Sequence, residues 1–198
     1  LIDYYMEDYI TKTVMPNGLT IVTEHIPSVK SVTAGIWVKS GARHETVQQA
    51  GVTHFLEHML FKGTKNRTAF EIAQSMESVG GYLNAFTSTE YTCYYARCLD
   101  TELRTALDVL SDMVMHPIFP KEEIEKEKKV VIEEMKMYRD SPDDYLFEEF
   151  TSHLFKDHPL GRPILGSEET VSAFTDDDLF QYMRAVSYTH LTLPTSNS

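Results

Sequence analysis

Short apolar runs and a turn sequence occupy the first 40 residues, a pattern that predicts β-strands. Two such runs, at residues 11–15 and 19–24, flank the turn sequence Pro16-Asn17-Gly18 and are expected to pair as a hairpin. A third apolar run, at 31–40, is expected to form another strand. The chain therefore begins with strands rather than helices.

The spacing of the apolar residues then changes to three and four, which predicts helices. Between residues 50 and 61 the residues at this spacing are Val52, Phe55, Leu56 and Met59. The sequence at 62–64 ends this helix. Thr68 and Glu71 form a capping-box pattern that opens a second helix, which is expected to end at the glycine pair 80–81.

Strands and helices are mixed over the rest of the chain. Segments 82–87 and 91–99, joined by a short polar turn, are interpreted as an antiparallel strand pair. Helical patterns follow from about residue 101, at 121–139, at 145–155 and at 178–185, with a break at Ser141-Pro142. Tight hairpins favour an α+β fold, with a largely antiparallel sheet packed against helices, over a doubly wound parallel sheet.

Composition limits the class of protein and its partners. A chain of 198 residues with 42% hydrophobic content is long enough for one globular domain. Its net charge of −12 argues against a nucleic-acid partner, which requires clustered Lys and Arg. No apolar run approaches the roughly 20 residues that span a bilayer, and residues 1–10 are acidic, unlike a targeting peptide. We expect neither a nucleic-acid nor a membrane partner.

Two cysteines, Cys93 and Cys98, lie in the same predicted strand. Side chains alternate between the faces of a strand, so their odd separation points them to opposite faces, too far apart to bond. We expect two buried thiols and no disulfide framework.

Residues 54–58, His-Phe-Leu-Glu-His, form an H-x-x-E-H motif, the inverse of the H-E-x-x-H signature of zinc peptidases. On a helix, positions i, i+3 and i+4 share a face, so the rings of His54 and His58 converge with the Glu57 carboxylate beside them. The pattern predicts that the two histidines bind zinc and that Glu57 activates water. The alternative is a pair of solvated or otherwise satisfied histidines.

A tetrahedral catalytic zinc needs a third protein ligand. The helix at 121–139 carries one stripe, made of Ile124, Glu127, Val131, Glu134 and Tyr138. A carboxylate on an apolar stripe is costly unless it meets a cation, so Glu134 is the predicted ligand. Glu133 lies among lysines, four residues after Lys129, and is interpreted as an exposed ion-pair partner. Glu127 is expected to orient a ligand or the water by hydrogen bonding, with an ordinary salt bridge as its alternative.

Three stretches carry a resemblance to a known family: HFLEHMLFKGT, GGYLNAFTSTEYTCYY and EKEKKVVIEEMKMYRDSPDD. They resemble the insulinase and pitrilysin superfamily of zinc metallopeptidases, closest to the mitochondrial processing peptidase branch and its bacterial relatives, over residues 12–185. In that family the third ligand follows the second histidine at about the spacing of Glu134, and a further catalytic glutamate matches Glu127. The resemblance thus implies the same two choices.

The resemblance also implies how substrate binds. The family's α/β unit is normally duplicated and paired into a closed chamber, so the expected partner is a second homologous domain or subunit. Asn84, Ala85 and Phe86 match the edge strand onto which an extended peptide adds, although Asn84 has the alternative of an ordinary polar residue near a turn. The expected activity is zinc-dependent endopeptidase cleavage of extended or unfolded peptides, in the bacterial cytoplasm rather than the mitochondrial matrix.

Two rival functions stay open. The S-ribosylhomocysteine lyase group shares the H-x-x-E-H motif but completes its metal site with a cysteine, and Cys93 and Cys98 lie in the wrong region for that. The second rival is a non-catalytic partner subunit of a processing-peptidase-like heterodimer. Such subunits usually lose ligands, whereas all of the predicted ligands are present here.

The domain prediction separates residues 1–185, an amino-terminal peptidase domain incomplete at its carboxyl end, from 186–198. The sequence VSYTHLTLPT in that last segment matches one reading frame of a common sequencing adapter, so we expect a non-native tail. The chain begins at Leu1 rather than Met, which is compatible with a missing upstream segment. Arg43 and Glu45 are left unassigned. The histidines without ligand spacing are expected to be surface or packing residues: His25, His44, His116, His153, His158 and His190.

Overall fold

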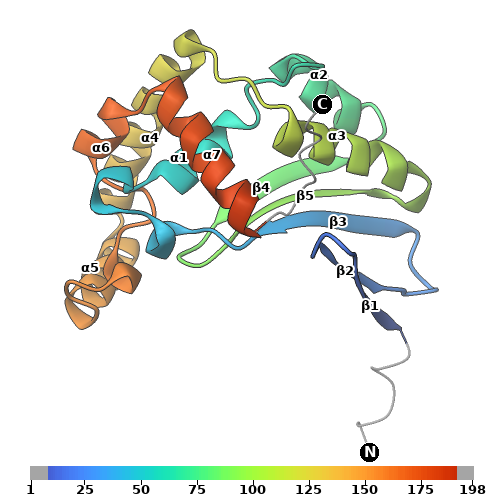
Figure 1. Cartoon of the computed structure of the whole chain (residues 1–198), viewed down its shortest axis with the longest axis horizontal. Coiled ribbons are helices and arrows are strands. Elements are labelled where there is room, and N and C mark those ends of the chain that lie inside the picture. Colours follow the sequence, from blue (N-terminus) through green and yellow to red (C-terminus); the bar gives the residue numbers. More distant parts are fainter. Residues whose placement is uncertain (1–8, 191–198) are drawn as a thin grey trace, which may run out of the picture.

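A computed structural model describes residues 9–190 as an α+β fold, in which helices cover one face of an antiparallel sheet (Figure 1). The predicted fold class is confirmed. The central sheet has the strand order β3–β5–β4, with β3 at Ser31–Val38, β5 at Thr92–Leu99 and β4 at Tyr82–Thr87. A separate two-stranded sheet pairs β1 (Ile10–Val14) with β2 (Thr20–Glu24).

The β1–β2 hairpin forms where the turn sequence predicts it. Gly18 has a φ of +88°, a conformation that suits glycine, and the Asn17 side chain accepts a hydrogen bond from the Leu19 amide at 3.1 Å. Every residue of both strands is exposed. The hairpin is therefore held by its own ladder more than by a core.

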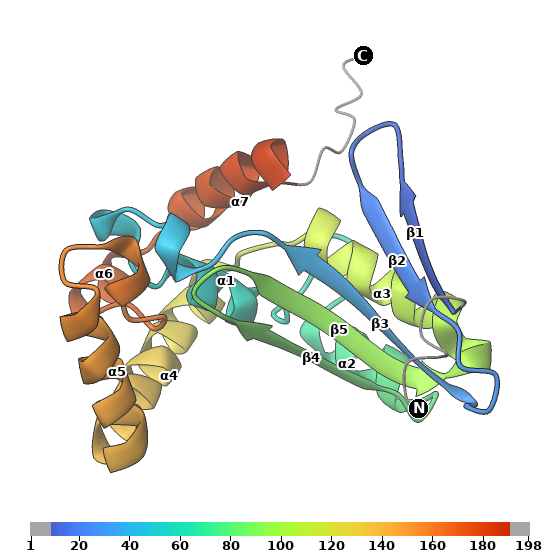
Figure 2. The same cartoon turned by 90° about the horizontal axis from the view of Figure 1, so that it is seen from below.

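Strand β5 is the central strand of the larger sheet. Its residues Tyr94, Ala96 and Cys98 are buried on the face that the helices cover, because alternate side chains point the same way. Cys93 is also buried but lies on the other face, and both thiols are free, as the odd separation predicted. Figure 2 shows the sheet from the side that the helices leave open.

The helices provide most of the core. Their bounds are α1 Val52–Met59, α2 Ala69–Glu77, α3 Leu103–Met115, α4 Lys121–Asp140, α5 Pro142–Leu154, α6 Glu168–Ala173 and α7 Asp176–His190. Short 3₁₀ turns lie at Ala42–His44, Val47–Gln49, Asp100–Glu102 and Pro159–Gly161. Fully buried side chains from α1, α2 and α3, including Phe55, Ile72 and Leu110, pack under the sheet. None of the helices in the described residues is both long and apolar enough to cross a membrane.

Three helices differ from the prediction. Helix α5 begins at Pro142 rather than residue 145, since proline suits the first helical position. Helix α6 was not expected, because its Ser167 cap pairs with Thr170 instead of a Glu or Gln. Helix α7 continues past Ala185 to His190, because extending a helix needs no new nucleation. The predicted tail at 186–198 thus begins within a helix, and 191–198 lies outside the described residues.

Candidate metal centre and peptide groove

Helix α1 presents the H-x-x-E-H motif from a buried base. Its apolar side chains Phe55 and Met59 are fully buried in the core. His54 and His58 lie one turn apart on another side of the helix, with ring centroids 4.6 Å apart. His54 is only 7% exposed, so the core fixes the direction in which its ring points.

Helix α4 packs against α1 and brings a carboxylate to the two rings. Glu134 Oε2 lies 3.7 Å from His54 Nε2 and 3.6 Å from His58 Nε2. One ligand atom from each of the three residues lies within 4.8 Å of the others. Ligand atoms about 2.1 Å from a tetrahedral zinc are separated by roughly 3.4 Å. Two imidazole nitrogens and one carboxylate oxygen at these distances fit that ion.

The His54 ring lacks the partners that a buried polar group normally has. Its Nδ1 is buried and has no hydrogen-bond partner among residues 9–190. Burial, with the positive charge of His58 as a smaller cause, lowers the pKa of His54 to about 3, so the ring is neutral near pH 7. A neutral Nε2 facing a carboxylate at 3.7 Å makes no hydrogen bond, whereas a cation between the two would bind both. The donor set is therefore compatible with a metal ion.

Glu127 lies behind His58 and fixes which nitrogen of that ring faces Glu134. Its Oε1 is 2.8 Å from His58 Nδ1, and its Oε2 is 2.6 Å from Lys62 Nζ. Burial would raise the pKa of Glu127, but the hydrogen bonds with His58 and Lys62 outweigh burial and lower it. For His58 the effects are reversed: burial lowers its pKa, but the hydrogen bond with Glu127 and the charge of Glu134 raise it overall. A charged Glu127 thus holds the ring with Nε2 turned toward the centre.

Glu57 lies beside this group without being part of it. Its Oε2 accepts a hydrogen bond from Thr87 Oγ1 at 2.5 Å, which ties it to the end of β4. Burial raises the pKa of Glu57, and the bond from Thr87 partly opposes the rise. A carboxylate whose pKa lies above the ordinary range is better suited to accept a proton near neutral pH.

The remaining positions on α4 differ from the prediction in two respects. Glu133 is exposed and forms an ion pair, but with Lys136 at 2.7 Å rather than with Lys129. Tyr138 was expected on the buried stripe, yet it is 45% exposed and Met135 is buried in its place. A stripe at alternating spacings of three and four has a period of 3.5, so it drifts around a helix of 3.6 residues per turn.

A cavity of about 410 Å³ lies beside the candidate metal centre and reaches strand β4. His54, Glu57 and Glu134 line it together with Ala85 and Phe86 of β4, whereas His58 is not among its lining residues. Strand β4 is an edge strand, with β5 on one side and no strand on the other among residues 9–190. Asn84 does not line the cavity.

Asn84 lies on the same strand with its side chain folded back. Its Oδ1 accepts a hydrogen bond from the Ala85 amide at 2.9 Å, and its Nδ2 donates to the Tyr82 hydroxyl at 2.5 Å. The side chain of Asn84 thus satisfies a backbone amide next to the cavity. Where a strand edge has no neighbour, such local bonds take the place of a ladder.

Glu45 positions helix α1 and was missed from sequence. It is 3% exposed, and its two carboxylate oxygens accept hydrogen bonds at 2.8 Å from the amides of Gly51 and Thr53. The helix begins after Gly51, which has a φ of +89° and no capping side chain, so Glu45 supplies the missing cap from outside. The sequence signal for this role was an acidic residue, Glu45, a few positions before a helix whose N-cap, Gly51, has no side chain to cap it.

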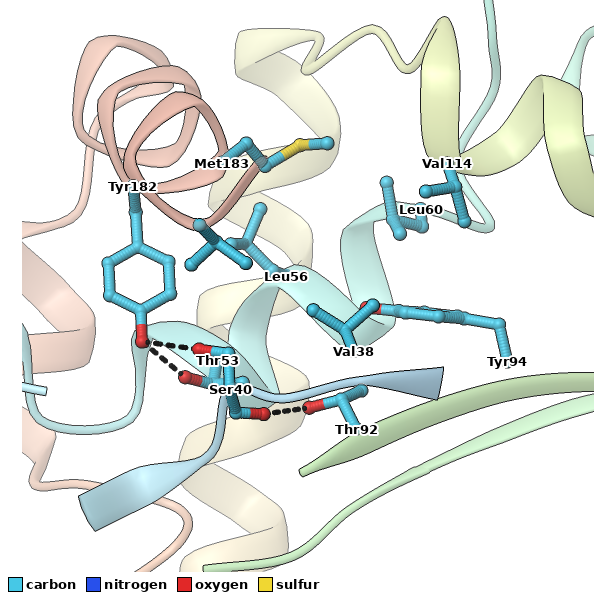
Figure 3. A pocket seen from close by; sticks show the side chains of 11 residues that line it. Val38, Ser40, Thr53, Leu56, Leu60, Thr92, Tyr94, Val114, Tyr182 and Met183 are labelled. Atoms are coloured by element: carbon cyan, nitrogen blue, oxygen red, sulfur yellow. Dashed lines mark hydrogen bonds between the residues drawn. The ribbon is translucent and has the colours of Figure 1, made fainter. Parts of the chain in front are cut away.

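Tyr182 of α7 also holds α1 in place (Figure 3). Its hydroxyl lies 3.0 Å from Ser40 Oγ and 3.0 Å from Thr53 Oγ1. Thr53 directly precedes the predicted ligand His54. The pocket around these groups has a volume of about 50 Å³ and is lined mainly by apolar side chains. It is too small for a substrate and corresponds to a packing gap under α7.

Arg43, which was left unassigned, and the histidines expected at the surface or in packing lie apart from the centre. Among residues 9–190, one group of three or more His, Cys, Asp or Glu side chains brings ligand atoms together, and it consists of His54, His58 and Glu134. Arg43 forms an ion pair with Glu90 at the surface. The remaining histidines do not join the group, and the side chain of His190 lies outside the described part.

The sequence and the fold were compared with those of known proteins. The insulinase family (Peptidase family M16) matches residues 20–168. A protein named uncharacterized zinc protease YmxG, from Bacillus subtilis, is 53% identical over 167 residues, which cover 84% of this chain and 41% of that protein. Another zinc protease, ML0855 from Mycobacterium leprae, is 47% identical over 173 residues, which cover 87% of this chain and 39% of that protein. The chain spans about two fifths of the length of these relatives.

Solved structures agree with the sequence comparison. A protease from Helicobacter pylori superposes with a TM-score of 0.84 at 25% identity, covering 89% of this chain and 43% of that one. A peptidase M16 inactive domain from Pseudomonas fluorescens superposes with a TM-score of 0.78 at 17% identity, and the match covers 88% of this chain and 42% of that one. The second likeness concerns the fold alone.

Proposed function

The chain belongs to the insulinase family of peptidases, M16, and from that premise we propose that it is the metal-binding part of a zinc-dependent endopeptidase that cleaves extended or unfolded peptides. The observation that carries the proposal is the convergence of His54, His58 and Glu134 beside Glu57, at the end of a cavity along an edge strand.

The three converging side chains would hold the zinc ion. Their donor atoms are two imidazole nitrogens and one carboxylate oxygen, a set that leaves a coordination position open. When bound, zinc supplies Lewis acidity, which polarises a carbonyl group and acidifies water. Glu127 fixes the ring of His58, and Lys62 keeps Glu127 charged while it does so.

Glu57 would act as the general base. It removes a proton from the attacking water and later delivers that proton to the leaving amine, so it must exchange the proton readily near neutral pH. Its raised pKa favours this role. The hydrogen bond from Thr87 restrains the carboxylate at the end of β4, where the cavity meets the strand edge.

The substrate would bind in an extended form along β4. Backbone pairing to an edge strand recognises peptides with little dependence on sequence. The cavity runs from Ala85 and Phe86 to Glu57, so a strand added to β4 would lead toward the predicted ligands. By analogy with the family, a second homologous domain or subunit closes the site.

A non-catalytic partner subunit is the alternative function. A subunit of that kind has no need of a base held by a dedicated hydrogen bond, yet both Glu57 and its partner Thr87 are present beside an intact ligand set. A cysteine-completed lyase site is disfavoured because Cys93 lies on the open face of the sheet, while Glu134 meets the histidines.

The proposal is tested by separating metal binding from chemistry. In the complete protein that contains this chain, Glu57→Gln should keep about one zinc per chain while peptide turnover falls by at least about 100-fold, since general base catalysis contributes that much. Glu134→Ala and His58→Ala should lose zinc instead. Elemental analysis and hydrolysis of an unstructured peptide measure both properties. Unchanged zinc in His58→Ala, or near-normal turnover in Glu57→Gln, would refute the assignment.

A further inference from the structure

The open face of the central sheet carries a cluster of aromatic rings. Trp37 of β3 meets Phe86 of β4 edge to face, with ring centroids 5.8 Å apart, and meets Tyr91 at 5.3 Å. Phe86 also lies 6.1 Å from Tyr91 and 6.2 Å from Tyr95. Trp37 is 61% exposed and Phe86 is 39% exposed. We call these four residues the aromatic face.

The register of the strands explains why the rings meet. Trp37 is paired with Cys93 on β5, and Cys93 is paired with Phe86 on β4, so the three side chains form one row across the sheet. Directly opposed side chains on neighbouring strands lie about 5 Å apart on the same face. The two large rings cover the small thiol between them, which leaves Cys93 only 2% exposed.

The row ends at the strand edge where substrate is proposed to bind. Phe86 is the last member, and beyond it no strand follows among the described residues. Phe86 also lines the cavity that contains Glu57, so it belongs both to the aromatic face and to the peptide groove. A strand added to β4 would place one side chain directly opposite Phe86, on the same face of the sheet.

We propose that the aromatic face is a specificity site, which selects peptides with a large apolar side chain at the position paired with Phe86. This inference rests on the proposed function and adds the chemical class of one substrate side chain. Apolar and aromatic side chains gain most from such a position, because they extend a row of exposed rings and remove them from water. An acidic side chain there would lose hydration and meet the negative faces of the rings, so it would gain no partner.

The occupant is a substrate side chain because of where Phe86 lies. The exposed rings continue without a break into the wall of the cavity that leads to Glu57, so whatever pairs with β4 meets both. The two faces of an added strand also differ. Side chains on one face point toward the cavity and the helices, and those on the other face point to the side of the aromatic rings, so the side chain paired with Phe86 is selected while its two sequence neighbours are not.

The experiment uses the chain's only tryptophan, Trp37, as the reporter. The 198-residue chain is loaded with zinc and carries Glu57→Gln, so that bound peptide stays intact. It is titrated with a short peptide of Ala and Ser that has one central Phe, and with the same peptide bearing Ser at that position. The Phe peptide should bind about 3- to 10-fold more tightly and shift the emission of Trp37 to shorter wavelength, since aromatic pairing and loss of water act together.

Variants of Phe86 separate this site from general stickiness. Phe86→Ser should abolish the preference for the Phe peptide, whereas Phe86→Leu should keep most of it. Phe70→Ala on α2 is the matched control, since Phe70 is an exposed aromatic residue that neither lines the cavity nor belongs to the aromatic face, and it should change nothing. Unchanged thermal unfolding verifies that each variant is folded.

The outcomes distinguish this inference from the proposed function. Equal affinity for the two peptides, a preference that survives Phe86→Ser, or a constant Trp37 emission would overturn the specificity site. The zinc and turnover measurements on Glu57→Gln would still stand in that case. If no peptide binds the zinc-loaded chain at all, both the specificity site and the pairing of a peptide with β4 are refuted. The assignment of the metal ligands is then judged separately, from the zinc content of the chain.

Discussion

Glu127 and Glu134 lie two turns apart on α4, yet their surroundings shift their pKa values in opposite directions. Glu127 receives hydrogen bonds from His58 and Lys62, and these lower its pKa in spite of burial. For Glu134, burial outweighs the charge of His58 and raises the pKa. A carboxylate with two donors is already satisfied, whereas one without a hydrogen-bond donor is better placed to bind a cation.

Replacing Glu127 tests its indirect role. Glu127→Gln keeps the shape but removes the charge that orients His58, so zinc affinity or activity should fall by about 10- to 100-fold rather than disappear. Competition with a zinc chelator measures the affinity. Glu133→Gln on the same helix is the control, since Glu133 is exposed and forms its ion pair with Lys136 at the surface. A loss as large as that of Glu134→Ala would mean that Glu127 itself binds the metal.

Asp112 should make stability depend on pH at the acidic end. Burial would raise its pKa, but hydrogen bonds from Thr64, Asn66 and Arg67 lower it from 3.8 to about 2. Because the folded pKa is depressed, the stabilisation is complete above pH 4 and is lost as the pH falls toward 2, amounting to roughly 2 kcal/mol. Urea unfolding of the chain across this range should show the loss, and Asp112→Asn should flatten it. Asp108→Asn, at an exposed partner of Arg67, should leave most of the slope intact.

At the scale of elements, local signals predicted more than long-range ones. The Thr68 capping box, the Gly18 turn and the H-x-x-E-H helix all formed where the sequence placed them, because each depends on neighbours a few residues away. The order β3–β5–β4 was not predicted, since strand pairing between residues 31–38 and 92–99 depends on the whole fold. The cap from Glu45 was missed for another reason: its carboxylate reaches the amides of Gly51 and Thr53 across a turn, outside the positions at which a capping residue is normally found.

Glu45→Gln should loosen the start of α1. An amide offers one acceptor where two backbone amides need partners, so we expect a loss of about 1–2 kcal/mol in the free energy of unfolding. Zinc affinity should weaken as well, because Thr53 precedes His54 directly. Chemical denaturation and chelator competition measure the two effects. Glu90→Gln, which removes only a surface ion pair with Arg43, should have neither effect.

For the whole molecule, the chain spans about two fifths of the length of its curated relatives. We expect it to bind zinc but to cleave peptides about 100- to 1,000-fold more slowly than the complete protein, because a second unit would supply further charge stabilisation and exclude water. The test compares turnover of one unstructured peptide by residues 1–185 and by the complete protein. Equal specific activity would show that one unit is sufficient.

The β1–β2 hairpin has a consequence for how the molecule opens. All residues of its strands are exposed, and within the described part of the chain no helix packs extensively on it, whereas β5 lies between two strands over the core. Local opening of the hairpin should therefore cost little, and its amide hydrogens should exchange with deuterium long before those of β5. Exchange at β5 should require global unfolding and track the urea stability. The β1–β2 hairpin and the central sheet therefore have two separate free energies of opening. A single melting temperature would report only the larger one, that of the sheet.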